Sequence, residues 1–101
     1  MKIRFTKKDP TQVFQQFQEQ LRGRKLGELV QFESVDQNIR VIIKKMGTSI
    51  LEFEHQQEGD LHEWVLTTEK IALAHRAFKG EILEKIIAMV EKIGGSVQHD
   101  R

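Results

Sequence analysis

Cysteine is absent from this chain of 101 residues, which excludes disulfide bonds, thiolate metal sites and a cysteine nucleophile. Long hydrophobic runs are absent as well. The longest extends from Ile86 to Val90, whereas a membrane-spanning helix needs about 20 apolar residues. Residues 1–8 contain no apolar segment of the kind that a secretory signal requires. These absences predict a soluble, cytoplasmic protein without a membrane partner.

Catalytic and cofactor-binding motifs are also absent. None of the three serines, Ser34, Ser49 and Ser96, lies in the Gly-x-Ser-x-Gly context of a nucleophile elbow. The chain has no glycine-rich phosphate-binding loop either. We therefore expect no catalytic residues, no cofactor and no enzymatic activity.

Charged residues are plentiful but unevenly distributed. Hydrophobic residues make up 39% of the chain and charged residues 31%, a balance typical of one folded domain. The formal net charge is +1, yet residues 1–50 contain ten Lys and Arg against five Asp and Glu, and residues 51–101 contain six against ten. This asymmetry indicates either a charged partner or charge pairing between the two halves of one fold.

Two segments show the apolar spacing of amphipathic helices. The first begins at Asp9-Pro10, because aspartate suits an N-cap and proline suits the first helical position, and it ends at Gly23. The second covers residues 71–93, with Gly80 marking a bend or a late start and Gly94-Gly95 marking its end. Its apolar positions lie three or four residues apart: Ile71, Ala74, Phe78, Ile82, Ile86, Met89 or Val90, and Ile93.

Alternating apolar and polar residues predict five strands, near residues 2–6, 30–33, 39–44, 51–54 and 63–66. Short turns join the last four, so neighbours are expected to pair as hairpins. The predicted fold class is α+β, an antiparallel sheet packed against helices in the order β-α-β-β-β-β-α. This order resembles the helix-grip or TBP-like architecture, which hosts DNA binding, lipid binding and catalysis alike. We expect a single domain over residues 1–95 and a polar C-terminal tail over residues 96–101.

Matching the apolar faces of neighbouring strands predicts their register, since a slip of one residue would turn every apolar side chain outward. On the inner face, Phe32 is expected opposite Val41. Val41 is in turn expected opposite Phe53, and Phe53 opposite Trp64.

The outer face of the predicted sheet combines a charge ladder with apolar residues. Arg40 is expected between Glu33 and Glu54, and opposite charges across strands contribute about 0.2–1 kcal/mol per pair. Four apolar residues join Arg40 on this face as a candidate interface: Leu29, Ile42, Ile50 and Val65. They form either a contiguous patch that mediates homodimerisation or singly exposed residues that need no explanation.

Two histidines, His55 and His62, are predicted to form a cross-strand pair on the inner face, with Asp36, Glu58 and Asp60 in nearby turns. Imidazoles near carboxylates can bind a metal or respond to pH. A zinc site needs three or four ligands at fixed geometry. No third ligand can be identified, so no metal is expected.

Basic residues gather at one end of the predicted sheet, near the start of the last helix: Arg22, Arg24, Lys25, Lys44, Lys45 and Lys70. Cations beside a helix N-terminus favour phosphate, nucleic acid or an acidic protein surface. Alternatively, the three cations that follow the first helix simply neutralise its C-terminal end. The absence of aromatic residues among them argues against single-stranded nucleic acid.

Three functions remain open. The preferred one is a non-catalytic protein-interaction or regulatory domain that self-associates through the outer sheet face, with Ile42→Asp expected to abolish association. The second is nucleic-acid or anion binding through the basic end. The third is a carrier of a small apolar ligand between the sheet and the C-terminal helix, although six phenylalanines and one tryptophan are enough to fill a core of this size.

Overall fold

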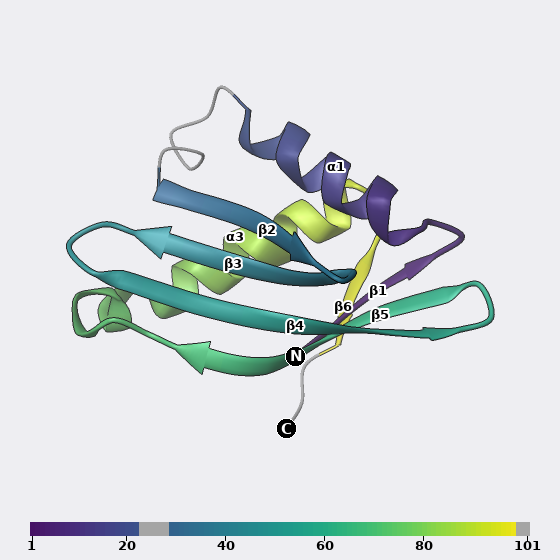
Figure 1. Ribbon diagram of the computed structural model, residues 1–101. Helices are drawn as coiled ribbons and strands as arrows, with labels where there is room; N and C mark the ends of the chain where they lie inside the picture. Colours follow the sequence, from purple (N-terminus) through teal and green to yellow (C-terminus); the bar gives the residue numbers. More distant parts are fainter. Residues whose placement is uncertain (23–28, 99–101) are drawn as a thin grey trace.

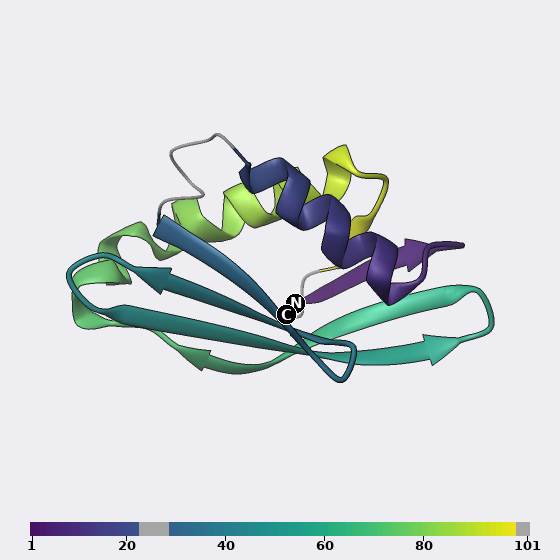
Figure 2. The same ribbon diagram turned by 45° about the horizontal axis from the view of Figure 1, so that its top comes forward.

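The computed structural model describes residues 1–22 and 29–98 and confirms an α+β fold (Figure 1). Six antiparallel strands form one sheet in the order β2-β3-β4-β5-β1-β6. In the described part of the chain, two α-helices cross one face of this sheet, and a short 3-10 helix, η1, lies at one end of it (Figure 2). The strands are β1 (Lys2–Thr6), β2 (Val30–Val35), β3 (Asn38–Lys44), β4 (Thr48–Glu58), β5 (Leu61–Lys70) and β6 (Ser96–Gln98). The helices are α1 (Pro10–Leu21), η1 (Leu73–Phe78) and α3 (Lys79–Lys92).

The first helix, α1, begins where the sequence predicts. The Asp9 side chain accepts a hydrogen bond from the Gln12 backbone N–H at 2.9 Å, and the Gln12 side chain accepts one from the Asp9 N–H at 3.2 Å. This capping box satisfies two N–H groups that the start of a helix leaves without partners. The buried stripe of α1 recurs every four residues and consists of Val13, Phe17 and Leu21.

The C-terminal helix is shorter than the predicted span of residues 71–93. Residues 73–78 form η1, and α3 begins at Lys79, immediately before Gly80. The predicted apolar face holds in the second half of α3, where Ile86, Met89 and Val90 are buried. It fails in η1, because a 3-10 helix has three residues per turn and rotates its side chains away from the stripe of an α-helix. Two residues predicted on that face are exposed instead: Ala74 and Phe78.

The two glycines after α3 end the helix, as the sequence predicts. Gly94 has a φ of +97°, which favours glycine. Its N–H donates to the Glu91 carbonyl at 3.2 Å, and the Gly95 N–H donates to the Val90 carbonyl at 2.9 Å, which together make a Schellman motif. A side-chain carbon on Gly95 would lie 2.6 Å from the Phe5 ring, so the chain passes too close to the core for any larger residue.

A sixth strand replaces part of the predicted polar tail. Residues 96–101 were expected to be a tail, but Ser96–Gln98 form β6 and pair with β1, with Val97 opposite Ile3. Three residues are too short to show strand alternation on their own. The pairing depends on the turn after α3, which directs the chain back along β1. Residues 99–101 lie outside the described residues.

The predicted register is correct for one hairpin and wrong by two residues for the next. Phe32 does lie opposite Val41. Val41, however, lies opposite Leu51, and Phe53 lies between Ile39 and Leu66 rather than opposite Trp64. A two-residue slip keeps every side chain on its face, so alternation alone cannot detect it. An irregularity next to Phe53 shifts the pairing with β5 further.

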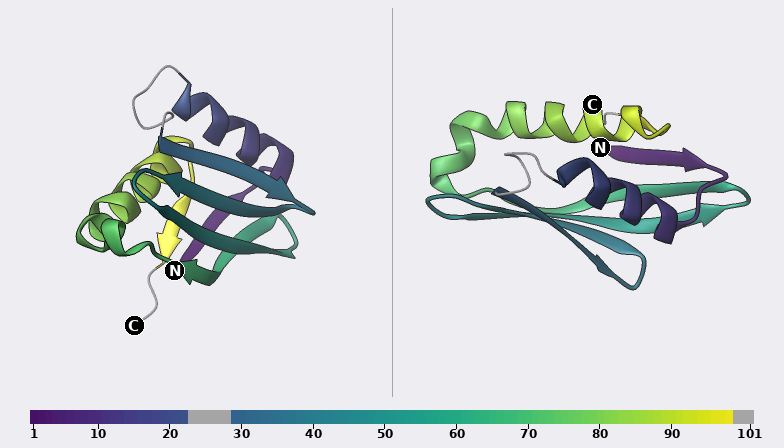
Figure 3. Two further views of the ribbon diagram at one scale, coloured as in Figure 1. Left: turned by 60° about the vertical axis from the view of Figure 1, so that its left-hand side comes forward. Right: turned by 90° about the horizontal axis from the view of Figure 1, so that it is seen from above.

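The core lies between the helices and the inner face of the sheet (Figure 3). Its largest members, Trp64, Phe5 and Phe17, are 0–2% exposed. The Phe5 ring meets Phe17 and Trp64 edge-on, with centroids 6.3 and 6.0 Å apart. Trp64 Nε1 donates a hydrogen bond to the Gln37 carbonyl at 2.9 Å, so its polar atom is satisfied. The described helices leave the other face of the sheet uncovered (Figure 2).

Candidate functional site

A pocket of about 470 Å³ opens at the end of the sheet where η1 meets α3. Val30 and Ile43 from the ends of β2 and β3 line one side, and Phe78 and Ile82 line the other. These walls are apolar because the inward positions of both strands and the stripe of α3 converge here. The polar groups that line the pocket come from the turn after β3, from η1 and from α3: Lys45, His75, Glu81 and Lys85.

A buried hydrogen-bonded chain fixes η1 against the sheet. His75 Nε2 lies 2.6 Å from the Lys45 carbonyl, which can only accept, so this nitrogen carries the proton. Nδ1 of the neutral ring is then an acceptor, and the Ser49 hydroxyl donates to it at 2.6 Å. Ser49 Oγ in turn accepts from the Ala72 N–H at 2.8 Å. Every polar group in this chain has a partner of the right kind.

Ser49 and His75 therefore have a structural role. Ser49 has no exposed surface and His75 is 5% exposed, so a substrate cannot reach the hydroxyl. Sequence reasoning did not connect these two residues. A signal was present, since Ser49 occupies the inward position that precedes Leu51 and Phe53 in the alternation of β4. A hydroxyl at a core position requires a buried partner.

The predicted basic end is only partly assembled. Lys44, Lys45 and Lys70 lie at the same end of the sheet, because Lys44 closes β3 and Lys70 closes β5 beside the start of β4. Arg22 lies at the end of α1 and forms an ion pair with Glu19 at 3.3 Å, in keeping with a role at the helix terminus. The two remaining predicted members, Arg24 and Lys25, lie outside the described residues.

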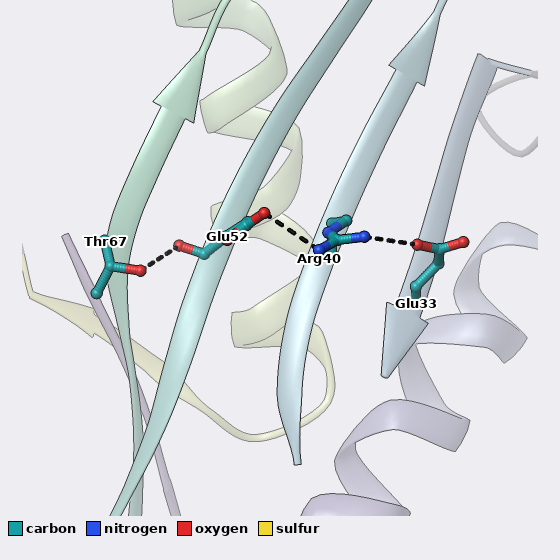
Figure 4. Close-up of polar contacts among 4 residues, drawn as sticks. All are labelled: Glu33, Arg40, Glu52 and Thr67. Carbon is teal, nitrogen blue, oxygen red and sulfur yellow. Dashed lines mark hydrogen bonds and ion pairs between the residues drawn. The ribbon is translucent and has the colours of Figure 1, made fainter. Parts of the chain in front are cut away.

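The charge ladder on the outer face is present with one different member. Arg40 contacts Glu33 at 3.6 Å and Glu52 at 3.3 Å, as Figure 4 shows. Glu54 was predicted in place of Glu52, and the two-residue register slip accounts for the error. The Thr67 hydroxyl donates to the Glu52 backbone carbonyl at 3.4 Å (Figure 4).

The predicted apolar interface does not form one contiguous patch. Ile42 and Ile50 lie directly opposite each other on the outer face, although Ile42 is only 9% exposed. Val65 lies apart from them, between Lys2 and Glu54. Leu29 was placed on the outer face, but it packs against the core and lines the pocket instead. The strand alternation that placed it there begins only at Val30.

The two predicted histidines do meet, but diagonally. His55 lies opposite Trp64 and His62 lies opposite Gln57, yet His55 Nε2 is 2.8 Å from His62 Nδ1. Burial, followed by the charge of His62, lowers the pKa of His55 below its ordinary value of 6.5. Among the described residues, no group of three or more His, Asp or Glu side chains is arranged to hold a metal.

Comparison of the chain with known proteins finds no match. No protein-family model matches the chain, and no curated protein or solved structure shows significant similarity to it. Within residues 1–22 and 29–98, no helix combines the length and the apolar character needed to cross a membrane. The features of the molecule that bear on function are the pocket, the outer sheet face and the charged surfaces.

Proposed function

We propose that the protein is a non-catalytic binding protein that holds a small apolar ligand in the pocket between the sheet, η1 and α3. The pocket itself is the observation that supports this proposal. Its volume of about 470 Å³ lies within the range of about 300–1,000 Å³ that is usual for sites of small organic ligands. The aromatic residues that were expected to fill the core gather elsewhere, and Phe78, which borders the pocket, is 53% exposed.

The chemistry of the lining favours binding over catalysis. Most of the wall consists of aliphatic and aromatic side chains, which stabilise an apolar ligand by removing its surface from water. His75 and Glu81 are lining groups of the kind that can act as general bases. Both ring nitrogens of His75 are already hydrogen-bonded to Ser49 and Lys45, and Glu81 is exposed to water. Lys45, Glu81 and Lys85 remain as polar groups that can orient a ligand at the opening.

The arrangement of elements supports the same proposal. The C-terminal helix α3 crosses a curved antiparallel sheet, as in the helix-grip architecture that the element order resembles (Figure 3). That architecture permits a small apolar ligand between the sheet and the long helix. The pocket occupies this place, because Val30 and Ile43 belong to the sheet and Ile82 belongs to α3.

A pocket-filling substitution tests the proposal. Ala74 lines the pocket and is the smallest side chain there, so Ala74→Phe places a ring in the space that a ligand would occupy. We expect the affinity for the fluorescent probe anilinonaphthalene sulfonate to fall at least about tenfold, equivalent to ~1.4 kcal/mol. Native mass spectrometry of protein purified from cells without refolding should also lose any non-covalent adduct.

Ala77→Phe is the matched control. Ala77 is also an exposed alanine of η1, but it does not line the pocket. The two variants carry the same added surface and the same helical context. Equal probe binding by both would contradict a site in the pocket.

Self-association through the outer sheet face is a second candidate, supported by the opposed pair Ile42 and Ile50 on the uncovered face. Ile50→Asp is a cleaner probe than Ile42→Asp, because Ile42 is only 9% exposed and a carboxylate there would disturb the fold. Sedimentation velocity should show a dimer that becomes a monomer in Ile50→Asp. Val65→Asp, on the same face but away from the pair, should leave the dimer intact. A dimer that survives Ile50→Asp would remove this candidate.

A further inference from the structure

We propose that one end of the molecule, here called the tip, docks onto the surface of lipid bilayers that contain anionic phospholipids. The tip consists of residues 44–48, around the turn between β3 and β4, and residues 69–79, which include η1. This inference goes beyond ligand binding and does not depend on it. It rests on the exposure, the packing and the charge of the tip.

Exposed apolar side chains concentrate at the tip. Among the described residues, four large hydrophobic side chains are exposed, and three of them belong to the tip: Met46 at 87%, Leu73 at 79% and Phe78 at 53%. The fourth, Val35 at 48%, closes β2 at the opposite end of the sheet. Single exposed apolar residues are ordinary, but three at one end of a small molecule indicate an interaction surface.

The turn and η1 form one packed unit, so these side chains are presented together. His75 in η1 is hydrogen-bonded to the carbonyl of Lys45 in the turn at 2.6 Å. A side-chain carbon on Gly47 would lie 3.1 Å from the Cβ of Ala72, which shows how closely the two segments approach. Figure 1 shows the β3–β4 turn beside η1 at the same end of the molecule.

The net positive charge of the tip favours binding to an anionic surface. Five cationic side chains and one carboxylate belong to it: Lys44, Lys45, Lys70, Arg76, Lys79 and Glu69. Glu69 forms an ion pair with Lys79 at 2.9 Å. No ion pair within the described part of the chain neutralises the other four cations. Basic residues around exposed apolar side chains are the combination that binds an anionic bilayer surface.

Two other occupants fit less well. A second copy of the chain would bring two tips of the same positive charge together, which is repulsive. Nucleic acid would satisfy the cations but would leave Met46 and Leu73 without apolar contacts. The expectation from the sequence that no membrane partner exists came from the lack of a spanning segment. Peripheral docking makes no such demand, because only side chains enter the interface.

Vesicle co-sedimentation with the full chain tests the proposal. The protein should sediment with vesicles of phosphatidylcholine mixed with phosphatidylglycerol, and should remain in the supernatant with vesicles of phosphatidylcholine alone. Binding should weaken as salt is raised. Lys44→Gln and Lys70→Gln should each reduce the affinity about fivefold, equivalent to ~1 kcal/mol. Failure to sediment with the anionic vesicles at low salt would overturn the proposal.

Apolar-to-polar variants that leave the charge unchanged separate docking from simple charge attraction. The double variant Met46→Gln with Leu73→Gln should abolish sedimentation, and its circular dichroism should match that of the unaltered protein, since both side chains are largely exposed. Val35→Gln is the control, because among the described residues Val35 is the exposed large apolar side chain at the opposite end. Retained binding in the double variant, or an equal loss in Val35→Gln, would contradict the proposal. Tighter binding to a DNA duplex that survives the double variant would assign the tip to nucleic acid instead.

Discussion

The two halves of α3 lie over the same sheet, but one half is packed tightly against it and the other borders a pocket. Its C-terminal half buries Ile86, Met89 and Val90 against the packed rings of Phe5, Phe17 and Trp64. We call this part of the molecule the closed half. The N-terminal half of α3, with η1, borders a pocket of about 470 Å³, and we call this part the pocket half. Figure 3 shows the helix extending from the η1 end toward the strands β1 and β6.

The difference follows from the residues that face each half. Aromatic rings fill the space where α1, α3 and β1 meet. At the other end, aliphatic residues such as Val30 and Ile43 reach less far, and no ring from the described residues fills the space between them and Ile82. The molecule thus separates a half that stabilises the fold from a half that contains the proposed ligand site. Four predictions test this division.

Removing a ring from each half should give the largest contrast. Phe17 is 2% exposed, so Phe17→Ala loses its buried contacts and leaves a cavity, at a cost of about 3–5 kcal/mol of unfolding free energy. Phe78 is 53% exposed and borders a pocket that already exists, so Phe78→Ala should cost less than about 1 kcal/mol. Urea denaturation measures both values. Similar losses would show that the pocket half is packed as tightly as the other.

The attachment of η1 should give the next largest effect. Ser49→Ala removes the donor to His75 Nδ1 and the acceptor of the Ala72 N–H. One buried and one partly buried polar group then lack partners, so we expect a loss of about 1–3 kcal/mol. Hydrogen exchange at the Ala72 amide should become faster than in the unaltered protein. Ser34→Ala, at an exposed serine of β2, is the control and should change neither quantity.

The Lys8 side chain is hydrogen-bonded to the C-terminal end of α3. The Lys8 ammonium donates to the Ile93 carbonyl, next to the end of the helix, and to Gln16 Oε1 at 2.9 Å. Lys8→Met should therefore lower the unfolding free energy by about 1 kcal/mol, since a cation at a helix C-terminus is lost together with its hydrogen bonds. The neighbouring exposed Lys7, changed to Met, is the comparison in thermal unfolding. Equal shifts would argue against this role of Lys8.

Much of the closed half can be predicted from the sequence, because its signals are local. Asp9-Pro10 predicts the start of α1, and Gly94-Gly95 predicts the end of α3, since capping depends on residues within one turn. The strands follow from alternation. The register between β3 and β4 could not be predicted, because a slip of two residues keeps Phe53 on the inner face and leaves the same pattern.

The pocket half was harder to predict because it depends on contacts between distant segments. Helical spacing continues through Ala74 and Phe78, so it gave no sign that residues 73–78 form a 3-10 helix. The Ser49–His75 hydrogen bond that holds this segment joins residues 26 positions apart. Only the assembled structure brings Met46, Leu73 and Phe78 to one end and turns three scattered residues into a surface.

The smallest expected effect concerns pH and the closed half. Burial, and then the nearby His62, lower the pKa of His55 in the folded protein below 6.5. The unfolded chain therefore binds more protons near this pH, so the unfolding free energy should rise with pH there. Stability is full above about pH 6.5, and it declines as the pH falls toward the lowered pKa of His55. The His55 ring contacts the Trp64 ring at a tilt, with centroids 5.0 Å apart, so acid should loosen the closed half rather than the pocket half. Urea denaturation across this pH range should show a shallower slope for His55→Gln than for the unaltered protein, and parallel slopes would contradict the assignment.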